Sequence, residues 1–120
     1  SLGAQTHMMD AQEHDEVVAV TSHVPHVIAS MVAANTPIEA RAVIGPGWRD
    51  TTRIASGNVQ LWRQIIQENH RPVLQALKKF ATIQADWIDA LEREDFDRIE
   101  SLLAVGKNVR DALGNRHSSG

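Results

Sequence analysis

The sequence contains no cysteine, so it forms no disulfide bonds, offers no thiolate for catalysis and leaves the redox compartment open. It also lacks an excess of positive charge. Its 12 Lys and Arg residues against 15 Asp and Glu residues give a net charge of −3, with both signs interspersed, so we expect neither a nucleic acid nor a membrane surface as partner. The opening residues, SLGAQTHMMD, lack a basic segment followed by an apolar core. We therefore expect no signal peptide and a cytoplasmic setting.

Charged residues are also missing between residues 17 and 38, the longest uncharged run of the chain. This run still contains two His, two Ser, two Thr, one Asn and two Pro, and such a run is too polar to span a bilayer. With 120 residues, of which 42% are hydrophobic, the chain has enough apolar side chains for the core of one domain.

The first expected helix begins at Asp10, which with Glu13 has the form of a capping box. Apolar residues at three- and four-residue spacing then predict one stripe that faces the core: Val17, Val20, Val24, Ile28 and Met31. The opposite face is small and polar, as the wall of a pocket requires, and includes Asp15, Ser22 and His26. Pro25 lies inside this helix, where we expect it to cause a kink and free a backbone carbonyl near Thr21.

The later part of the chain predicts further helices. A short helical piece covers residues 37–43, and Asn58 opens another helix. Two long helices follow, at 73–91 and 96–113, and Asp95 is the expected N-cap of the second. Both helices carry apolar rows wider than a single neighbour needs. The sequence therefore predicts an all-α bundle of about five helices, in which the two long antiparallel helices form the interface of a homodimer.

An irregular stretch, GPGWRDTTRIASGNVQLW, lies between these parts at residues 45–62. Its glycines and proline interrupt any incoming helix. Asp50 and Arg53 then stand three residues apart, where a carboxylate on a helix can orient a guanidinium. An arginine held in this way suits a planar carboxylate ligand, although the same spacing also fits an ordinary ion pair at the surface.

Two blocks of sequence carry a resemblance to a known family. The first is GWRDTTRIASGN followed by Leu61-Trp62 and Asn69, and the second is Glu13-His14-Asp15 followed by the run SHVPH at residues 22–26. Together they resemble the prephenate/arogenate dehydrogenases of tyrosine biosynthesis, with Trp48 where Phe is usual and Val24 where Leu is usual. The resemblance covers most of residues 2–113, but only the C-terminal helical half of the family.

The resemblance implies an oxidoreductase that decarboxylates prephenate or arogenate oxidatively with NAD or NADP, and it leaves open whether tyrosine inhibits the enzyme. The family's G-x-G-x-x-G turn and its catalytic histidine belong to a dinucleotide-binding half that is missing here, so we expect the 120-residue chain alone to be inactive. On this reading residues 1–9 are the end of a linker from that half. Residues 10–114 form the dimerisation and substrate-binding domain, and residues 115–120 are a disordered tail.

The resemblance also implies roles for individual residues. Arg53 would bind a substrate carboxylate, and Asp50 would orient it. His26 would form a hydrogen bond with the substrate or with tyrosine, Trp62 would close the pocket wall, and Gly47 would leave space for the ligand. Four further residues would hold these side chains in place without contacting the ligand themselves: His14, Asp15, Ser22 and His23.

Other readings of the same residues stay open. His14-Asp15 on a helix is also typical of metal-dependent HD phosphohydrolases, which need several further His and Asp ligands. His23 and His26 fit ordinary hydrogen-bonded histidines at a helix contact, and Trp62 fits a plain core residue. The chain also fits a catalytically inert helical dimerisation module.

Overall fold

The computed structural model describes residues 9–114, and all their regular structure is helical, which confirms the all-α prediction. The predicted linker, apart from residue 9, and the predicted tail at 115–120 lie outside the described residues. The chain divides into two compact units at Lys78/Lys79, and each unit is described by itself.

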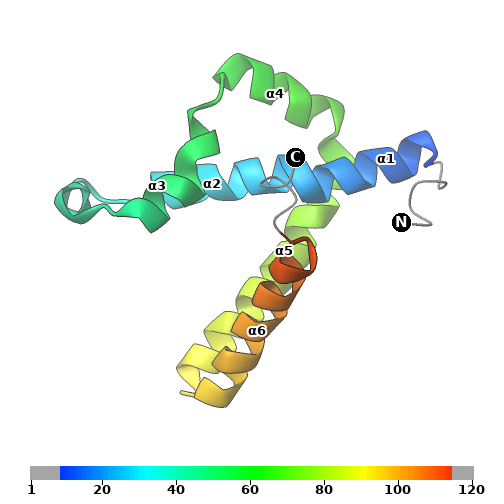
Figure 1. Ribbon diagram of the computed structural model, residues 1–120. Helices are drawn as coiled ribbons and strands as arrows, with labels where there is room; N and C mark the ends of the chain where they lie inside the picture. Colours follow the sequence, from blue (N-terminus) through cyan, green and yellow to red (C-terminus); the bar gives the residue numbers. More distant parts are fainter. Residues whose placement is uncertain (1–8, 115–120) are drawn as a thin grey trace. The chain divides into compact units, whose positions relative to one another are not determined.

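The first unit begins with one continuous helical stretch. It consists of α1 (Ala11–Val18), the π-helical turn η2 (Ala19–His23) and α2 (Val24–Ala34), drawn in blue to cyan in Figure 1. The predicted capping box is confirmed, because the Asp10 carboxylate accepts from the Glu13 backbone N–H at 2.8 Å and the Glu13 side chain accepts from the Asp10 N–H at 3.3 Å.

The helix accommodates Pro25 through the π turn that directly precedes it. Proline lacks the N–H that would complete the α-helical ladder, and the wider turn closes instead with a bond from the Val24 N–H to the Ala19 carbonyl. The Thr21 hydroxyl donates to the Val17 carbonyl at 2.9 Å. A π turn of this kind often marks a functional segment of a helix.

The predicted core stripe of this helix is only partly right. Val24 is buried and Ile28 packs against the core, but Val17, Val20 and Met31 are exposed. The buried face carries small or polar residues instead, namely Ala19, His26 and Ala29. The prediction assumed 100° per residue throughout, whereas the π turn changes the register, and small side chains let neighbouring elements approach closely.

Short elements follow α2 and lead back to it. They are the 3₁₀ turn η3 (Ile38–Val43), the helix α3 (Pro46–Thr52), the 3₁₀ turn η4 (Arg53–Ser56) and the helix α4 (Val59–Glu68). Both α3 and η4 pack against α2. Asn58 caps α4 as predicted, and its side chain accepts from the Leu61 N–H at 2.8 Å.

The core of this unit is small. Ala19, Val24 and Val73 are its buried members, and Val73 belongs to the start of α5 (His70–Glu92). Partly buried residues complete it: Ile28, Ile66, Ala76 and Leu77.

The stretch Ala11–Ala34 is long and apolar enough to cross a membrane by length and composition alone, and it is the one such helix among residues 9–114. Core helices pass the same test. Of the most apolar window of this stretch, 22% is buried inside the structure, and His26 is buried against Trp62 of α4.

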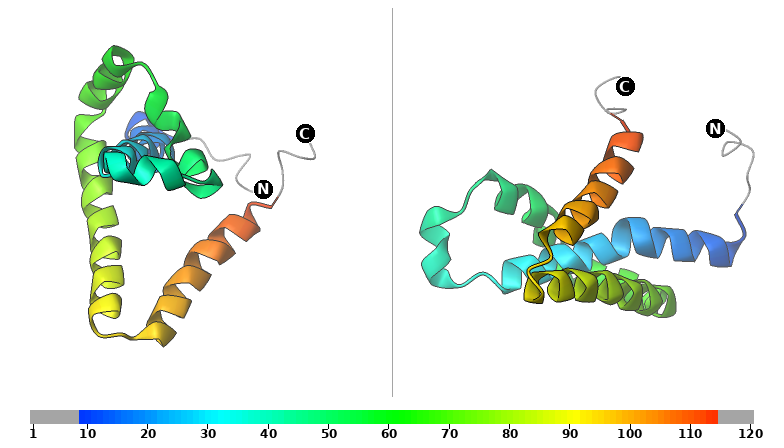
Figure 2. Two further views of the ribbon diagram at one scale, coloured as in Figure 1. Left: turned by 90° about the vertical axis from the view of Figure 1, so that its left-hand side faces the viewer. Right: turned by 90° about the horizontal axis from the view of Figure 1, so that it is seen from below.

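The second unit contains the rest of α5 and α6 (Phe96–Ala112), which runs back after a tight turn (Figure 2). Asp95 caps α6 as predicted, accepting from the Arg98 N–H at 3.1 Å. The Arg98 guanidinium donates to Asp89 at 2.7 Å and to Asp86 at 3.3 Å, which ties the two helices together near the turn. Most of the apolar side chains of this unit are exposed: Phe80, Ile83, Ile88, Leu91, Phe96, Leu103, Val105, Val109 and Leu113.

Candidate functional site

The centre of the first unit is a stack of two rings from distant parts of the chain. The His26 imidazole of α2 lies on the Trp62 indole of α4, with ring centroids 3.7 Å apart and planes inclined by 17°. His23 meets the same indole edge-on, at 6.0 Å and 84°. The two histidines of the SHVPH run therefore meet Trp62 in two different geometries.

Gly57 permits this stack because it has no side chain. A Cβ at this position would lie 2.9 Å from Trp62 Nε1 and 3.0 Å from His26 Cε1. Its φ of −61° and ψ of 162° suit any residue, so the steric requirement is the close approach of the two rings. The break at residues 56–58 thus lets Trp62 fold back onto α2.

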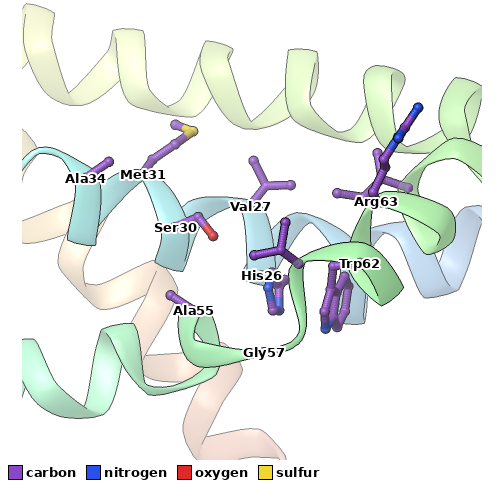
Figure 3. Close-up of a pocket in the computed structure, with 11 residues that line it drawn as sticks. His26, Val27, Ser30, Met31, Ala34, Ala55, Gly57, Trp62 and Arg63 are labelled. Carbon is purple, nitrogen blue, oxygen red and sulfur yellow. The ribbon is translucent and has the colours of Figure 1, made fainter.

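A pocket of about 500 Å³ opens beside the stack, a size typical of small-molecule sites. His26, Trp62 and Gly57 form one end of it, while Ser30 and Met31 extend along α2 (Figure 3). The remaining lining residues are mostly apolar: Val27, Ala34, Ala55, Val59, Arg63 and Ile66. Such a lining suits a ligand with a flat, largely apolar ring and a few polar groups.

Burial lowers the pKa of His26 below its usual value of 6.5. The physical cause is desolvation, which disfavours the charged imidazolium. His26 is therefore neutral at neutral pH and presents one donor and one acceptor nitrogen, so that it is suited to a hydroxyl group.

The buried side-chain amide of Asn69 contacts His23, the other histidine beside Trp62. Asn69 Nδ2 lies 2.9 Å from the Asp15 carbonyl oxygen and 3.2 Å from His23 Nδ1. Asn69 follows α4 directly, so it connects the α4–α5 junction to the π turn.

The structure separates the predicted arginine site from this pocket. Arg53 starts η4 and is exposed, and neither Arg53, Asp50 nor Gly47 lines the pocket. The expected pairing of Asp50 with Arg53 is wrong, because no hydrogen bond or ion pair joins them within residues 9–114. The reason lies in the backbone, since α3 ends at Thr52 and the next residues form a 3₁₀ turn.

Only some of the residues expected to support the site lie close to it. His23 reaches the stack, whereas His14 and Asp15 are exposed and contact each other at 3.5 Å. Asp15 contributes through its backbone carbonyl rather than its carboxylate. Ser22 is exposed on the π turn.

Four residues of this region were not among the predicted site residues: Ser30, Gly57, Arg63 and Asn69. Asn69 and Gly57 lie in the sequence blocks that carry the family resemblance, and that position was the available signal. Ser30 and Arg63 carry no motif, and Arg63 extends away from the stacked rings in Figure 3.

The described part of the chain offers no support for the HD phosphohydrolase reading. No group of three or more His, Asp or Glu side chains within residues 9–114 is arranged to hold a metal ion. His14 is exposed on α1, away from the rings of His23 and His26.

The fold defines an all-α domain with an aromatic pocket between its helices. The sequence profile of the family described as "Prephenate dehydrogenase, dimerization domain" matches residues 10–105. The chain therefore belongs to this family.

Similar proteins agree with the family match. The cyclohexadienyl dehydrogenase of Zymomonas mobilis is 34% identical over 97% of this chain, and the prephenate dehydrogenase of Bacillus subtilis is 33% identical over 88%. The chain spans only 42% and 30% of the lengths of these two proteins.

Two solved structures share the fold. The Synechocystis arogenate dehydrogenase matches 89% of this chain, and the chain covers 41% of it, with a TM-score of 0.82 and 23% identity. The A. aeolicus prephenate dehydrogenase, solved with hydroxyphenyl propionate and NAD+, matches 88% of this chain, which covers 39% of it, with a TM-score of 0.77 and 28% identity.

Proposed function

We propose that this chain is the part of an NAD- or NADP-dependent prephenate or arogenate dehydrogenase that binds the substrate ring and forms the homodimer. The observation that carries the proposal is the His26–Trp62 stack at the end of the pocket. A flat six-membered ring gains contact area against the aromatic wall, and neutral His26 supplies a hydrogen bond for a ring hydroxyl. A relative solved with hydroxyphenyl propionate supports this class of ligand.

Arg53 supplies the carboxylate contact in this proposal. It belongs to η4, the same turn as the pocket-lining Ala55. Its guanidinium is exposed and has no ion pair within residues 9–114, so both of its donor edges are available to a carboxylate.

The dinucleotide does not fit the residues of this chain. The sequence has no G-x-G-x-x-G run, and the described residues contain no strand that would precede such a turn. We therefore assign the dinucleotide, and the hydride transfer that it supports, to the greater part of the relatives' length that this chain does not cover.

The homodimer uses the second unit. Most apolar side chains of α5 and α6 in this unit are exposed, and an exposed apolar surface of this kind marks an interface. The family description, a dimerization domain, supports the same conclusion. A second copy of the chain would cover these side chains.

Titration of the chain with hydroxyphenyl propionate tests the substrate-binding part of the proposal. We expect the NMR signals of the His26 and Trp62 rings to shift on binding. His26→Ala should weaken binding roughly two- to tenfold, the value of one aromatic contact. Trp87→Phe, in the second unit, is the matched control and should bind as the wild type does. Ligand-induced shifts that leave the rings of His26 and Trp62 unchanged would contradict the proposal.

A further inference from the structure

Asn69 is a buried polar residue of the first unit, and its side chain contacts two partners from a distant part of the chain. Its side chain is 9% exposed. One nitrogen, Nδ2, contacts both the Asp15 carbonyl oxygen at 2.9 Å and His23 Nδ1 at 3.2 Å. Asn69 is 54 residues from Asp15 and 46 from His23, so the contact exists only in the folded chain.

The chemistry of these three groups fixes where the protons lie. A backbone carbonyl oxygen only accepts hydrogen bonds, so the Asn69 atom that faces Asp15 has to be the amino group. The same amino group faces His23 Nδ1 and donates its second hydrogen there. His23 Nδ1 is therefore the acceptor, and a neutral His23 ring carries its hydrogen on Nε2.

His23 is left with one free hydrogen-bonding position. Its lone pair on Nδ1 is engaged by Asn69, and Nε2 has no protein partner within residues 9–114. The ring is half-buried and lies edge-on against Trp62. A neutral His23 can thus donate a hydrogen bond from Nε2 at this place.

We propose that Asn69 is a positioning residue that holds His23 as an Nε2–H donor to an acceptor oxygen of the ligand bound beside Trp62. The identity of this acceptor rests on the proposed function, whereas the tautomer of His23 does not. His26 lines the pocket, whereas His23 lies outside its lining at the edge of Trp62, so the acceptor oxygen has to extend past the indole to reach His23. His23 only donates, while neutral His26 can donate or accept.

Nitrogen NMR of the histidine-labelled chain at alkaline pH tests the tautomer directly. In the wild type we expect His23 to carry its hydrogen on Nε2 and to have a bare Nδ1. Asn69→Asp has nearly the same shape but replaces the donor by an acceptor, so it should move the hydrogen to Nδ1. Asn58→Asp is the matched control, because it places the same charge at the other end of α4 and keeps the N-cap bond to Leu61.

The wild-type spectrum decides the tautomer even if Asn69→Asp does not fold. A hydrogen on Nδ1 of His23 in the wild type would overturn the proposal, as would an unchanged tautomer in a folded Asn69→Asp chain.

Titration with hydroxyphenyl propionate tests the donor role. Asn69→Asp should weaken binding roughly tenfold or more, the value of one lost hydrogen bond to a charged or polarised oxygen, while Asn58→Asp binds as the wild type does. Equal binding by all three chains would overturn the ligand contact. Absence of binding by the wild type would overturn the proposed function, and with it the ligand contact, while the tautomer result would stand by itself.

Discussion

The His26 imidazole lies 3.7 Å from the Trp62 indole, centroid to centroid, although 36 residues separate them in the chain. The spacing is that of a full ring stack rather than a chance contact. It depends on the absence of a side chain at Gly57, and it forms one end of the pocket in Figure 3. Single substitutions can test this stack and the exposed surface of the second unit separately.

Gly57→Ala should destabilise the fold. The new Cβ would lie within 3.0 Å of both stacked rings, and neither ring can move without losing the other. The backbone angles at Gly57 suit alanine, so the effect is one of overpacking, with an expected loss of about 1–3 kcal/mol in the free energy of unfolding. Denaturant unfolding measures it.

Gly47→Ala provides the control for this comparison. A Cβ at Gly47 meets nothing within 4 Å, and the residue lies inside α3. Replacement of a helical glycine by alanine should therefore stabilise the chain by about 0.5–1 kcal/mol. Equal stability of the Gly57→Ala chain and the wild type would show that the stack is not tightly held.

Arg53→Ala, made in the complete dehydrogenase, should raise the KM for the substrate at least about tenfold, because one charge-assisted hydrogen bond to a carboxylate is worth that much. Arg53→Lys should recover little, since lysine keeps the charge but loses the planar pair of donors. Steady-state kinetics with a check of helix content measure both.

Two neighbouring variants make this test specific. Arg49→Ala should change the KM much less. Asp50→Asn should leave stability within about 0.5 kcal/mol of the wild type, because no bond joins Asp50 to Arg53. A KM of Arg53→Ala within twofold of the wild type would reduce Arg53 to an ordinary surface residue.

Protonation of His26 should make the folded chain less stable as the pH is lowered. Burial lowers the pKa of His26 in the folded state below 6.5, the value expected for the unfolded chain. Between pH 6.5 and the lower folded-state pKa, the unfolded state therefore binds more protons than the folded state. The contribution of His26 to stability is fully present above pH 6.5 and is lost as the pH falls through this window. His26→Phe keeps a ring on Trp62 but cannot ionise. Its melting temperature should fall less steeply than that of the wild type, and parallel curves across the window would contradict this.

The chain should be a homodimer in solution. Light scattering should give twice the 13.3 kDa of one chain, because an interface that covers the exposed apolar residues of α5 and α6 has to bury on the order of 2,000 Å². Leu103→Glu, at a residue that is 57% exposed, should produce monomers. Ser101→Glu lies about 200° away around α6 and should stay dimeric. A wild-type monomer at micromolar concentration, without aggregation, would exclude the dimer.

The 120-residue chain by itself should neither bind a dinucleotide nor oxidise prephenate. The reason is the missing glycine-rich turn, which in nucleotide-binding folds holds the pyrophosphate at a helix N-terminus. Calorimetry with NAD+ and an absorbance assay for its reduction measure the two activities. Measurable turnover by the pure chain would show that the catalytic residues lie within these 120 residues.

Much of the local structure was predictable from the sequence. Asp10 and Glu13 predicted the start of the first helix, Asn58 that of α4 and Asp95 that of α6, and all three were confirmed. A cap depends on residues three positions apart, so short-range pattern is sufficient for it. The family was also recognisable, because its residues lie in two continuous blocks.

The candidate site was only partly predictable, because it depends on more than short-range pattern. His26 and Trp62 were expected in one site and meet there, but the expected bond between Asp50 and Arg53 is absent. The helix of α3 ends between those two residues, and sequence spacing assumes that it continues. The buried face of the first helix was misplaced because a π turn interrupts the 3.6-residue period.

By itself, the sequence determined the helical class, the caps and the residues that carry the family resemblance. Only the tertiary structure brings Asn69 from 46 residues away into contact with His23 Nδ1, and the tautomer that we propose for His23 depends on this contact. The tertiary structure also decided that Gly57 has to be small, because the two rings that a Cβ would meet come from α2 and α4. Caps and periodicity are local interactions, whereas proton positions and close contacts depend on neighbours that exist only after folding.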